Sequence, residues 1–173
     1  MRVSQEIEIT PTSVLLNGQP IATQETGEKM LVELYRRYAG DYPKFFKMDT
    51  LCRLGFIAAE MLLNGKMVNA VILANRSASI KNDTDYLATI SDGNYYPSPA
   101  LFVYTLPNIV TGEIAIRHHI QGETSFYILD KPEELEPIIR STFSSPLTTL
   151  LAGWVECCAA NEFYAKIQII WNN

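Results

Sequence analysis

Two stretches in the first third of the chain have the residue spacing of α-helices. Between Thr26 and Tyr38, apolar residues recur every three to four positions, with charged residues on the opposite side, which predicts a half-buried helix. Between Asp49 and Asn64, the polar residues fall on one narrow stripe and apolar residues cover the rest. This second pattern predicts a helix that is buried on most sides and ends at Asn64-Gly65.

Four later segments have the composition of β-strands. The run VNAVILA at 68–74 is continuously apolar, as is typical of a central strand covered on both faces. TSFYIL at 124–129 is a second apolar strand. TLLAGWVECC at 149–158 and EFYAKIQIIW at 162–171 are joined by a short connection, which favours antiparallel neighbours. A helix that leads into a buried strand predicts an α/β sandwich.

Turn residues separate the remaining extended segments. IEIT at 7–10 and SVLL at 13–16 predict one or two short strands, with a turn at Asn17-Gly18. ALFVYTL at 100–106 predicts a strand or an extended segment. The chain shows no internal repeat, linker or low-complexity tract, so we expect residues 1–173 to form a single domain.

Capping residues predict two short helices in the middle of the chain. Asn82 or Asp83 can cap a helix that runs through Ile90, because both side chains accept hydrogen bonds from backbone N–H groups of a first turn. Pro107 suits the first position of a helix over 108–120, where its missing N–H costs nothing.

Two local predictions concern charged residues near these helices. Glu113 and Arg117 are spaced for an i,i+4 ion pair, which we expect on an exposed helix edge. Asp130, followed by proline and glutamate, has the arrangement of a capping box. Pro137 interrupts the first turns after it, so we expect a short or broken helix that ends near Phe143.

Composition narrows the class of protein. The 173 residues are 47% hydrophobic and 19% charged, with a net charge of -5 and three cysteines. No basic run offers the surface on which nucleic-acid binding depends, so we expect no nucleic-acid partner. Three cysteines cannot form a paired disulfide framework, which favours a reducing compartment. The N-terminus does not resemble a signal peptide and no apolar run reaches about 20 residues, so we expect no membrane span and a cytoplasmic location.

The sequence offers little support for a cofactor or a metal. There is no P-loop and no GxGxxG fingerprint, so a nucleotide site is not predicted. His118 and His119 are the only histidines; as helix neighbours they point about 100° apart and cannot share one metal ion. We therefore expect no metal and no cofactor.

Three further features have an ordinary and a functional interpretation. Strand alternation is expected to bury one of Cys157 and Cys158 and leave both inert, and Cys52 is expected in the core. The loop ANRSAS at 74–79 follows a buried strand, so it is either a site for a small anion or a simple turn. YPKFFKMD at 42–49 is either a stacking surface for single-stranded nucleic acid or, as we prefer, an aromatic plug over the sheet edge.

Three stretches together resemble the N-terminal half of a β-ketoacyl synthase, a condensing enzyme with the thiolase fold. They are YPKFFKMDTLCRLGFIAAEMLL at 42–63, SPALFVYTLPNIVTGEIAIRHHIQG at 98–122 and LLAGWVE at 150–156. The second is the most specific, since it is similar to the family pattern S-P-x-x-x-x-x-T-x-P-N-x-x-x-G-x-x-[AS]-I-x-x-x-x-x-G. The resemblance implies an α/β, thiolase-like half-fold: a five-stranded mixed sheet with helices on both faces and the last strand antiparallel.

The resemblance also implies that the family's chemistry is missing. Counting from Gly122 without gaps, the position of the family's nucleophilic cysteine falls on Lys131, and the C-terminal half that carries the family's catalytic histidines has no counterpart here. Condensation needs a thiolate and nearby imidazoles. We therefore expect no condensing activity and no enzyme of this class.

Two segments are implicated in association by the same resemblance. In the family, one lines the acyl pocket and the other pairs across a two-fold axis, and both are apolar here, which an isolated half-domain could not easily cover. The residues implicated are Leu101, Phe102, Val103, Tyr104, Ser125, Phe126, Tyr127 and Ile128.

The leading hypothesis is a non-catalytic ketosynthase-like accessory subunit of a fatty-acid or polyketide assembly system, similar to a chain-length factor. Its partner is expected to be a full-length ketosynthase or a second copy of the chain, with acyl carrier protein as a further partner. The alternative is a stand-alone homodimeric binding protein for acyl carrier protein or an acyl ligand. A third hypothesis, an enzyme with different chemistry, rests on Lys131 or the loop at 74–79 and lacks an acid-base pair.

Overall fold

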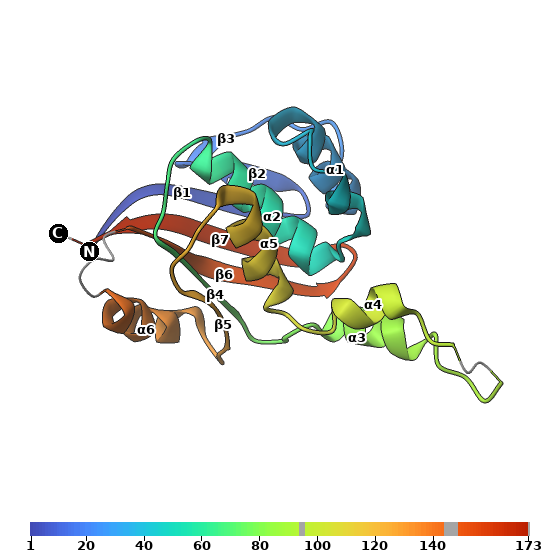
Figure 1. Ribbon diagram of the computed structural model, residues 1–173. Helices are drawn as coiled ribbons and strands as arrows, with labels where there is room; N and C mark the ends of the chain where they lie inside the picture. The colour runs from blue at the N-terminus through green and yellow to red at the C-terminus, as the bar shows by residue number, and fades with distance from the viewer. Residues whose placement is uncertain (94–95, 144–148, 173) are drawn as a thin grey trace.

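The computed structural model describes residues 1–93, 96–143 and 149–172, and its strands form one mixed sheet (Figure 1). The strand order is β3-β2-β1-β7-β6-β4-β5. β4 is parallel to β5 and to β6, and the remaining pairs are antiparallel. The strands are β1 (Arg2–Thr10), β2 (Ser13–Leu16), β3 (Gln19–Pro20), β4 (Ala70–Asn75), β5 (Thr124–Ile128), β6 (Thr149–Ala159) and β7 (Glu162–Trp171).

The prediction of a five-stranded sheet was wrong, because the described sheet has seven strands. The additional strands are the short β2 and β3 beyond β1. Asn17 and Gly18 both have positive φ, at 53° and 75°, as the two central residues of a tight hairpin turn require. This turn folds the N-terminal segment back on itself and widens the sheet at that edge.

Helices cover the two faces of the sheet unequally (Figure 1). α1 (Gly27–Tyr38), α2 (Thr50–Leu63) and α5 (Ile109–His118) lie on one face with the 3-10 turn η1 (Pro43–Lys47). The other face carries the turn η2 (Pro132–Glu134) and α6 (Leu135–Thr142). Helices on both faces and an antiparallel final strand, β7, agree with the predicted α/β architecture. No helix within the described ranges is long and apolar enough to cross a bilayer.

α2 is the central helix of the larger hydrophobic core. Every residue from Thr50 to Leu63 is buried except Arg53, as the narrow polar stripe predicts. The Asp49 side chain caps the helix by accepting a 2.9 Å hydrogen bond from the backbone N–H of Cys52. Asn64 ends it in the left-handed conformation, with φ at 36°. Burial of each large apolar side chain of such a helix contributes about 1.5–3 kcal/mol.

The second face is covered only in part. α6 packs on a smaller core that includes Leu135, Ile139 and Trp154. Beyond it, β7 alternates between residues buried in the larger core and half-exposed residues such as Lys166 and Gln168. Such alternation is typical of an antiparallel sheet with one solvated face.

The segment at 100–106 is helical as far as Val103 and then turns, so its prediction as a strand or extended segment was wrong. α4 (Pro99–Val103) begins after Ser98, whose hydroxyl accepts a 3.3 Å hydrogen bond from the backbone N–H of Leu101. Proline at the first helical position supports the same start. The apolar composition suggested a strand, but Ser98 and Pro99 start a helix. The preceding helix, α3 (Ile80–Leu87), begins earlier than predicted, so Asn82 lies inside it and does not cap it.

Two predictions about charged residues were also wrong. Glu113 is only 5% exposed and contacts the η1 region, while Arg117 pairs with Glu60 and Asp41. They therefore form contacts across helices, not an exposed pair with each other. Asp130 does not cap the next helix; its backbone N–H donates to Glu134 over 3.2 Å, and the helical turn begins one residue later.

Candidate functional site

The sheet ends at β5, which pairs with β4 alone among the described strands. The register places Phe126 opposite Leu73 on the larger core and Tyr127 on the smaller one. Ser125, Phe126 and Tyr127 are half-buried, and Ile128 is 52% exposed. An edge strand presents a row of free N–H and C=O groups that can pair with another chain. β5 is thus one open edge of the described sheet, and β3 is the other.

The residues predicted on α4 differ in exposure. Phe102 and Val103 are exposed at 58% and 47%, whereas Leu101 is half-buried. Tyr104 is buried, and burial raises its pKa to about 12. Of these four residues, Phe102 and Val103 therefore present the most apolar surface to a partner. The ring of Phe102 packs against Tyr86 of α3, with centroids 5.6 Å apart.

Two exposed apolar residues next to this set were missed from the sequence. Leu106, after α4, and Ile116, on α5, are exposed at 56% and 63%. Gly112 and Ile116 are four residues apart and share a side of α5, and this spacing could have indicated the second of them. We call the exposed large apolar residues of α4, of the turn after it, of α5 and of β5 the edge patch. Its members are Phe102, Val103, Leu106, Ile116 and Ile128.

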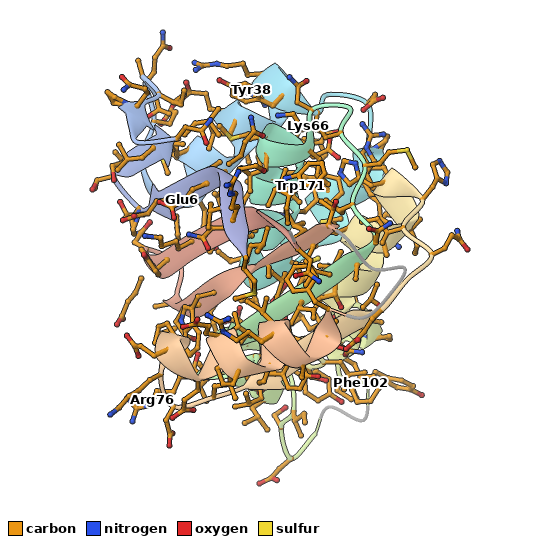
Figure 2. The ribbon with its side chains drawn as sticks, turned by 90° about the vertical axis from the view of Figure 1, so that its left-hand side faces the viewer. Glu6, Tyr38, Lys66, Arg76, Phe102 and Trp171 are labelled. Carbon is orange, nitrogen blue, oxygen red and sulfur yellow. The ribbon has the colours of Figure 1, made fainter. Side chains whose placement is uncertain are left out.

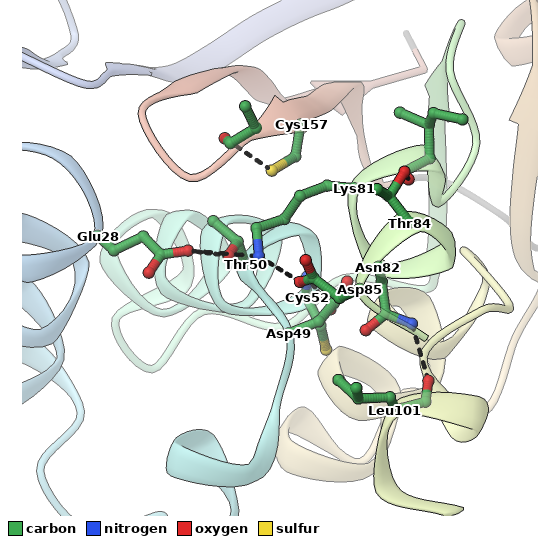
Figure 3. Close-up of polar contacts among 12 residues, drawn as sticks. Glu28, Asp49, Thr50, Cys52, Lys81, Asn82, Thr84, Asp85, Leu101 and Cys157 are labelled. Atoms are coloured by element: carbon green, nitrogen blue, oxygen red, sulfur yellow. Dashed lines mark hydrogen bonds and ion pairs between the residues drawn. The ribbon is translucent and has the colours of Figure 1, made fainter. Parts of the chain in front are cut away.

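The arm formed by α3 and α4 projects from one end of the sheet and is held there by polar contacts (Figures 1 and 3). The Asn82 amide donates to the carbonyl of Leu101 over 2.8 Å, and the Ser79 hydroxyl donates to the carbonyl of Thr105 over 2.7 Å. The Lys81 ammonium lies 2.7 Å from Asp85 and 4.0 Å from Glu28 of α1. The first two bonds join α4 and the turn after it to α3, and the Lys81–Glu28 contact joins α3 to α1.

The loop that follows β4 encloses a carboxylate of the protein itself. The backbone N–H groups of Arg76 and Ser77 donate to Glu156 of β6 over 2.9 and 3.3 Å, and the Ser77 hydroxyl donates to the same carboxylate. Asn75 and Ala78 close the loop through reciprocal hydrogen bonds of 2.8 and 2.9 Å. We considered this loop as a site for a small anion. Its donors instead bind the carboxylate of Glu156.

Lys131 and the histidines lie at opposite ends of β5. Lys131 is exposed at the start of η2, and no ion pair joins its ammonium to another described residue. His118 precedes β5, and its Nε2 lies 2.9 Å from the Glu60 carboxylate. β5, a strand of five residues about 16 Å long, lies between them in the chain. The structure does not bring the lysine and an imidazole together.

The cysteines follow the predicted pattern of burial. Cys157 is 1% exposed and burial raises its pKa to about 12, while its neighbour Cys158 is exposed. Cys52 is buried in the core, and burial raises its pKa. A thiol reacts as the thiolate, so both buried cysteines are poor nucleophiles. Among the described residues, no group of three or more histidine, cysteine, aspartate or glutamate side chains is placed to hold a metal ion.

The aromatic run at 42–49 packs on helices, not on the sheet edge that we predicted. Phe45 is fully buried, and its ring stacks on Tyr35 of α1 with centroids 4.2 Å apart. Tyr42 stacks on Phe56 of α2 at 5.1 Å. Because these rings stack on one another inside the protein, they are not free to stack on bases. Of the run, Phe46 remains half-exposed.

Comparisons with known proteins agree on the fold. No family model and no curated protein matches the chain. A chain from the structure of a ketosynthase in complex with its chain length factor, from Xenorhabdus doucetiae, superposes with a TM-score of 0.69. It is 10% identical over 99% of this chain and 79% of that chain. A chain from the ishigamide ketosynthase/chain length factor gives a TM-score of 0.70 and 15% identity, over 98% of this chain and 61% of that chain.

The chain has the thiolase-like fold of these ketosynthase and chain length factor structures. At such identities the similarity establishes the fold alone. It confirms the architecture that the three sequence stretches implied, apart from the strand number. This ketosynthase-like fold places Lys131 after β5 and puts the loop at 74–79 at the same, carboxyl end of the parallel strands.

Proposed function

We propose that this protein is a non-catalytic ketosynthase-like subunit, similar to a chain-length factor, which pairs with a condensing enzyme through β5 and the edge patch. The observation that carries the proposal is the unpaired edge of β5, together with exposed apolar side chains on β5, on α5, on α4 and in the turn after α4. Unpaired backbone groups give a partner strand hydrogen bonds, and the flanking apolar residues give it surface to bury.

The similar structures support a choice of partner. The two similar structures are described as a ketosynthase with its chain length factor, so a full-length ketosynthase with the same fold is the partner we propose. One of the matched chains is only modestly longer than this one, since this chain covers 79% of it. Acyl carrier protein would then meet the assembled pair.

The absence of condensing activity is part of the proposal. Lys131, which the sequence resemblance aligns with the family's nucleophile, is exposed, and both histidines lie at the other end of β5. A nucleophile needs a base within hydrogen-bond reach and donors for the developing negative charge. Among the residues that the structure describes, no hydrogen bond or ion pair joins the exposed Lys131 ammonium to such a base or donor. The role that remains is to complete the partner's acyl pocket with α4 residues such as Phe102.

The first test is recovery of the partner. The tagged protein is purified from its native host and co-purifying chains are identified by mass spectrometry. Recovery of a full-length ketosynthase is expected, and Phe102→Asp and Ile128→Arg are expected to abolish it. Met67→Asp is the matched control, since Met67 is 85% exposed and follows Lys66, which Figure 2 places at the end of the molecule opposite to Phe102. Equal recovery with all three variants would refute the proposed interface.

A second test separates this proposal from the alternative homodimer. Native mass spectrometry of the purified protein alone gives its oligomeric state. A monomer that forms a complex only with a ketosynthase supports the accessory subunit, whereas a stable dimer without any partner supports the stand-alone binding protein. Activity of the complex should be unchanged by Lys131→Ala; its loss would show that Lys131 takes part in catalysis.

A further inference from the structure

A groove of about 470 Å³ runs along α6 on the second face of the sheet, away from the edge patch. It exists because α6 has only eight residues and leaves β7 and β1 uncovered beside it. Its lining follows β7 from Tyr164 to Ile170, a span of about 20 Å. Because this volume extends over about 20 Å, the groove is narrow and has room for one extended aliphatic chain.

The floor of the groove is apolar. Leu135 and Ile139 of α6 face Trp154 and Ile170 of the sheet, and all four side chains are at least nine-tenths buried. At the end nearest the N-terminus, Met1 and Val3 also line the groove and are exposed at 40% and 52%. Covering this surface with an aliphatic chain would remove apolar area from water, which stabilises binding by about 25 cal/mol per Å².

The charges at the rim do not favour an anionic ligand. Arg140 pairs with Glu136 of its own helix, with 3.1 Å from Nε to Oε1, and Lys166 lies 3.4 Å from Glu6. Glu133 lines the groove without an ion pair to any described residue. An anionic head group would meet this carboxylate, and the two cations that could offset it already have acidic partners. An uncharged head group avoids this repulsion.

Tyr164 supplies a polar contact for such a head group. Its hydroxyl has no hydrogen bond to any described residue, and burial, followed by nearby Glu8, raises its pKa. The hydroxyl therefore stays protonated at neutral pH and can both donate and accept. It lies at the end of the groove opposite to Val3, because β7 runs antiparallel to β6 and ends beside β1.

We infer that the groove along α6 binds a single uncharged aliphatic chain, with its head group at Tyr164 and its tail toward Val3. This inference concerns a different face from the proposed partner interface and does not depend on it. The occupant is defined by chemistry: a linear chain with a hydroxyl, ester or thioester head. The tail lies over Trp154, which makes binding observable by fluorescence.

The test uses the full chain with Trp171→Phe, which leaves Trp154 as the sole tryptophan. Bromododecanol quenches tryptophan fluorescence on contact, and we expect saturable quenching of Trp154 below the solubility limit of the probe. Val3→Asp is expected to weaken binding about tenfold, because it places a charge against the tail. Met67→Asp, which is remote from the groove lining, should leave it unchanged. Circular dichroism checks that each variant is folded.

Two further measurements make the inference specific. Dodecanoate and dodecylamine, used to displace the probe, should each compete less well than dodecanol, and Tyr164→Phe should weaken dodecanol without changing binding of a plain alkane. Absence of saturable quenching, or equal quenching in the Val3→Asp protein, would overturn the site. Tighter binding of either charged ligand would overturn the assignment of an uncharged head group.

Discussion

The carboxylate of Glu156 accepts a 2.9 Å hydrogen bond from the backbone N–H of Arg76, which lies 80 residues earlier in the chain. This bond joins β6 to the loop that leads from β4 into the α3–α4 arm. The arm carries Phe102 and Val103 of the edge patch. The Glu156 carboxylate therefore holds the loop from which this part of the proposed interface extends.

Replacement of Glu156 by alanine should loosen this loop. The change removes three hydrogen bonds to one carboxylate, and we expect a loss of about 2 kcal/mol in the free energy of unfolding. Hydrogen exchange at the amides of Arg76 and Ser77 should accelerate together. Glu162→Ala, at an exposed position of β7, is the control. Unchanged exchange at both amides would show that the loop is held by other contacts.

Asp49→Asn should stabilise the protein at neutral pH. Burial raises the pKa of Asp49 from 3.8 to about 6, although Cys52, Lys81 and Arg53 oppose the shift. The folded state thus binds the proton more tightly than the unfolded state, so stability falls as pH rises from about 4 to about 6. Asparagine retains the capping oxygen without the charge. We expect a gain of about 1 to 2 kcal/mol at pH 7, after allowance for partial solvent access.

The pH dependence tests the cause of this gain. Urea denaturation of the wild-type protein at a series of pH values should show stability decreasing across the window from 4 to 6, and Asp49→Asn should flatten that portion of the curve. Asp92→Asn, at an exposed position, should leave the curve as it is in the wild type. A curve of the same shape in all three proteins would mean that Asp49 does not titrate in this window.

Arg117→Met should destabilise the protein by about 2 to 4 kcal/mol, because it leaves the Glu60 carboxylate buried with fewer partners. Glu60 is 8% exposed and accepts a 3.0 Å hydrogen bond from Arg117 Nε. Burial alone would raise the pKa of Glu60, but the hydrogen bonds from His118 and Arg117 lower it overall. The stability from this pairing is therefore present above the ordinary glutamate pKa and is lost as pH falls below it.

An exposed ion pair provides the control for this prediction. Arg140→Met breaks the pair with Glu136, whose side chains are 62% and 59% exposed, and should change the free energy of unfolding by no more than about 0.5 kcal/mol. The double variant Glu60→Gln with Arg117→Met should recover part of the loss, since no buried charge remains. Thermal denaturation at pH 7 gives all three values. Equal effects of the two arginine changes would contradict the role of burial.

The sequence predicted the helices and strands that depend on the pattern of nearby residues. α2 follows from its narrow polar stripe, and β4, β6 and β7 follow from apolar or alternating runs with a short connection. α4 was missed because its apolar composition also suits a strand, and the Ser98-Pro99 start decided the outcome. Local patterns therefore predicted most elements. They failed for the five residues of α4, whose composition suits both a strand and a helix.

Contacts between distant segments could not be read from spacing. Glu113 and Arg117 have the separation of a helical ion pair, yet each finds its partners on η1, α2 or the connection between α1 and η1. Likewise, the loop at 74–79 suggested an anion site, but only the fold shows that Glu156 fills it. Which residues of the edge patch are exposed also depends on packing. Phe102 is exposed, whereas Tyr104, two residues later, is buried.

Two glycine substitutions should have opposite effects on stability. A Cβ at Gly153 of β6 would lie 2.2 Å from the carbonyl oxygen of Lys166, which is backbone of the neighbouring strand and cannot move without breaking the sheet. Gly153→Ala should therefore destabilise the protein by about 2 to 4 kcal/mol. At Gly112 of α5, nothing lies within 4 Å of the added Cβ. Gly112→Ala should stabilise the protein by about 0.5 to 1 kcal/mol, through helix propensity alone.

The pair of substitutions is informative because the residue change is the same in both. Melting temperatures measured side by side should fall for Gly153→Ala and rise for Gly112→Ala. Since Gly112 lies on the outer side of α5 near Ile116, the stabilised variant also serves as a probe of the edge patch. If the patch accepts a partner closely, the added methyl group should weaken ketosynthase recovery although the protein itself is more stable. Undiminished recovery would place the partner contact away from Gly112, toward α4 and β5.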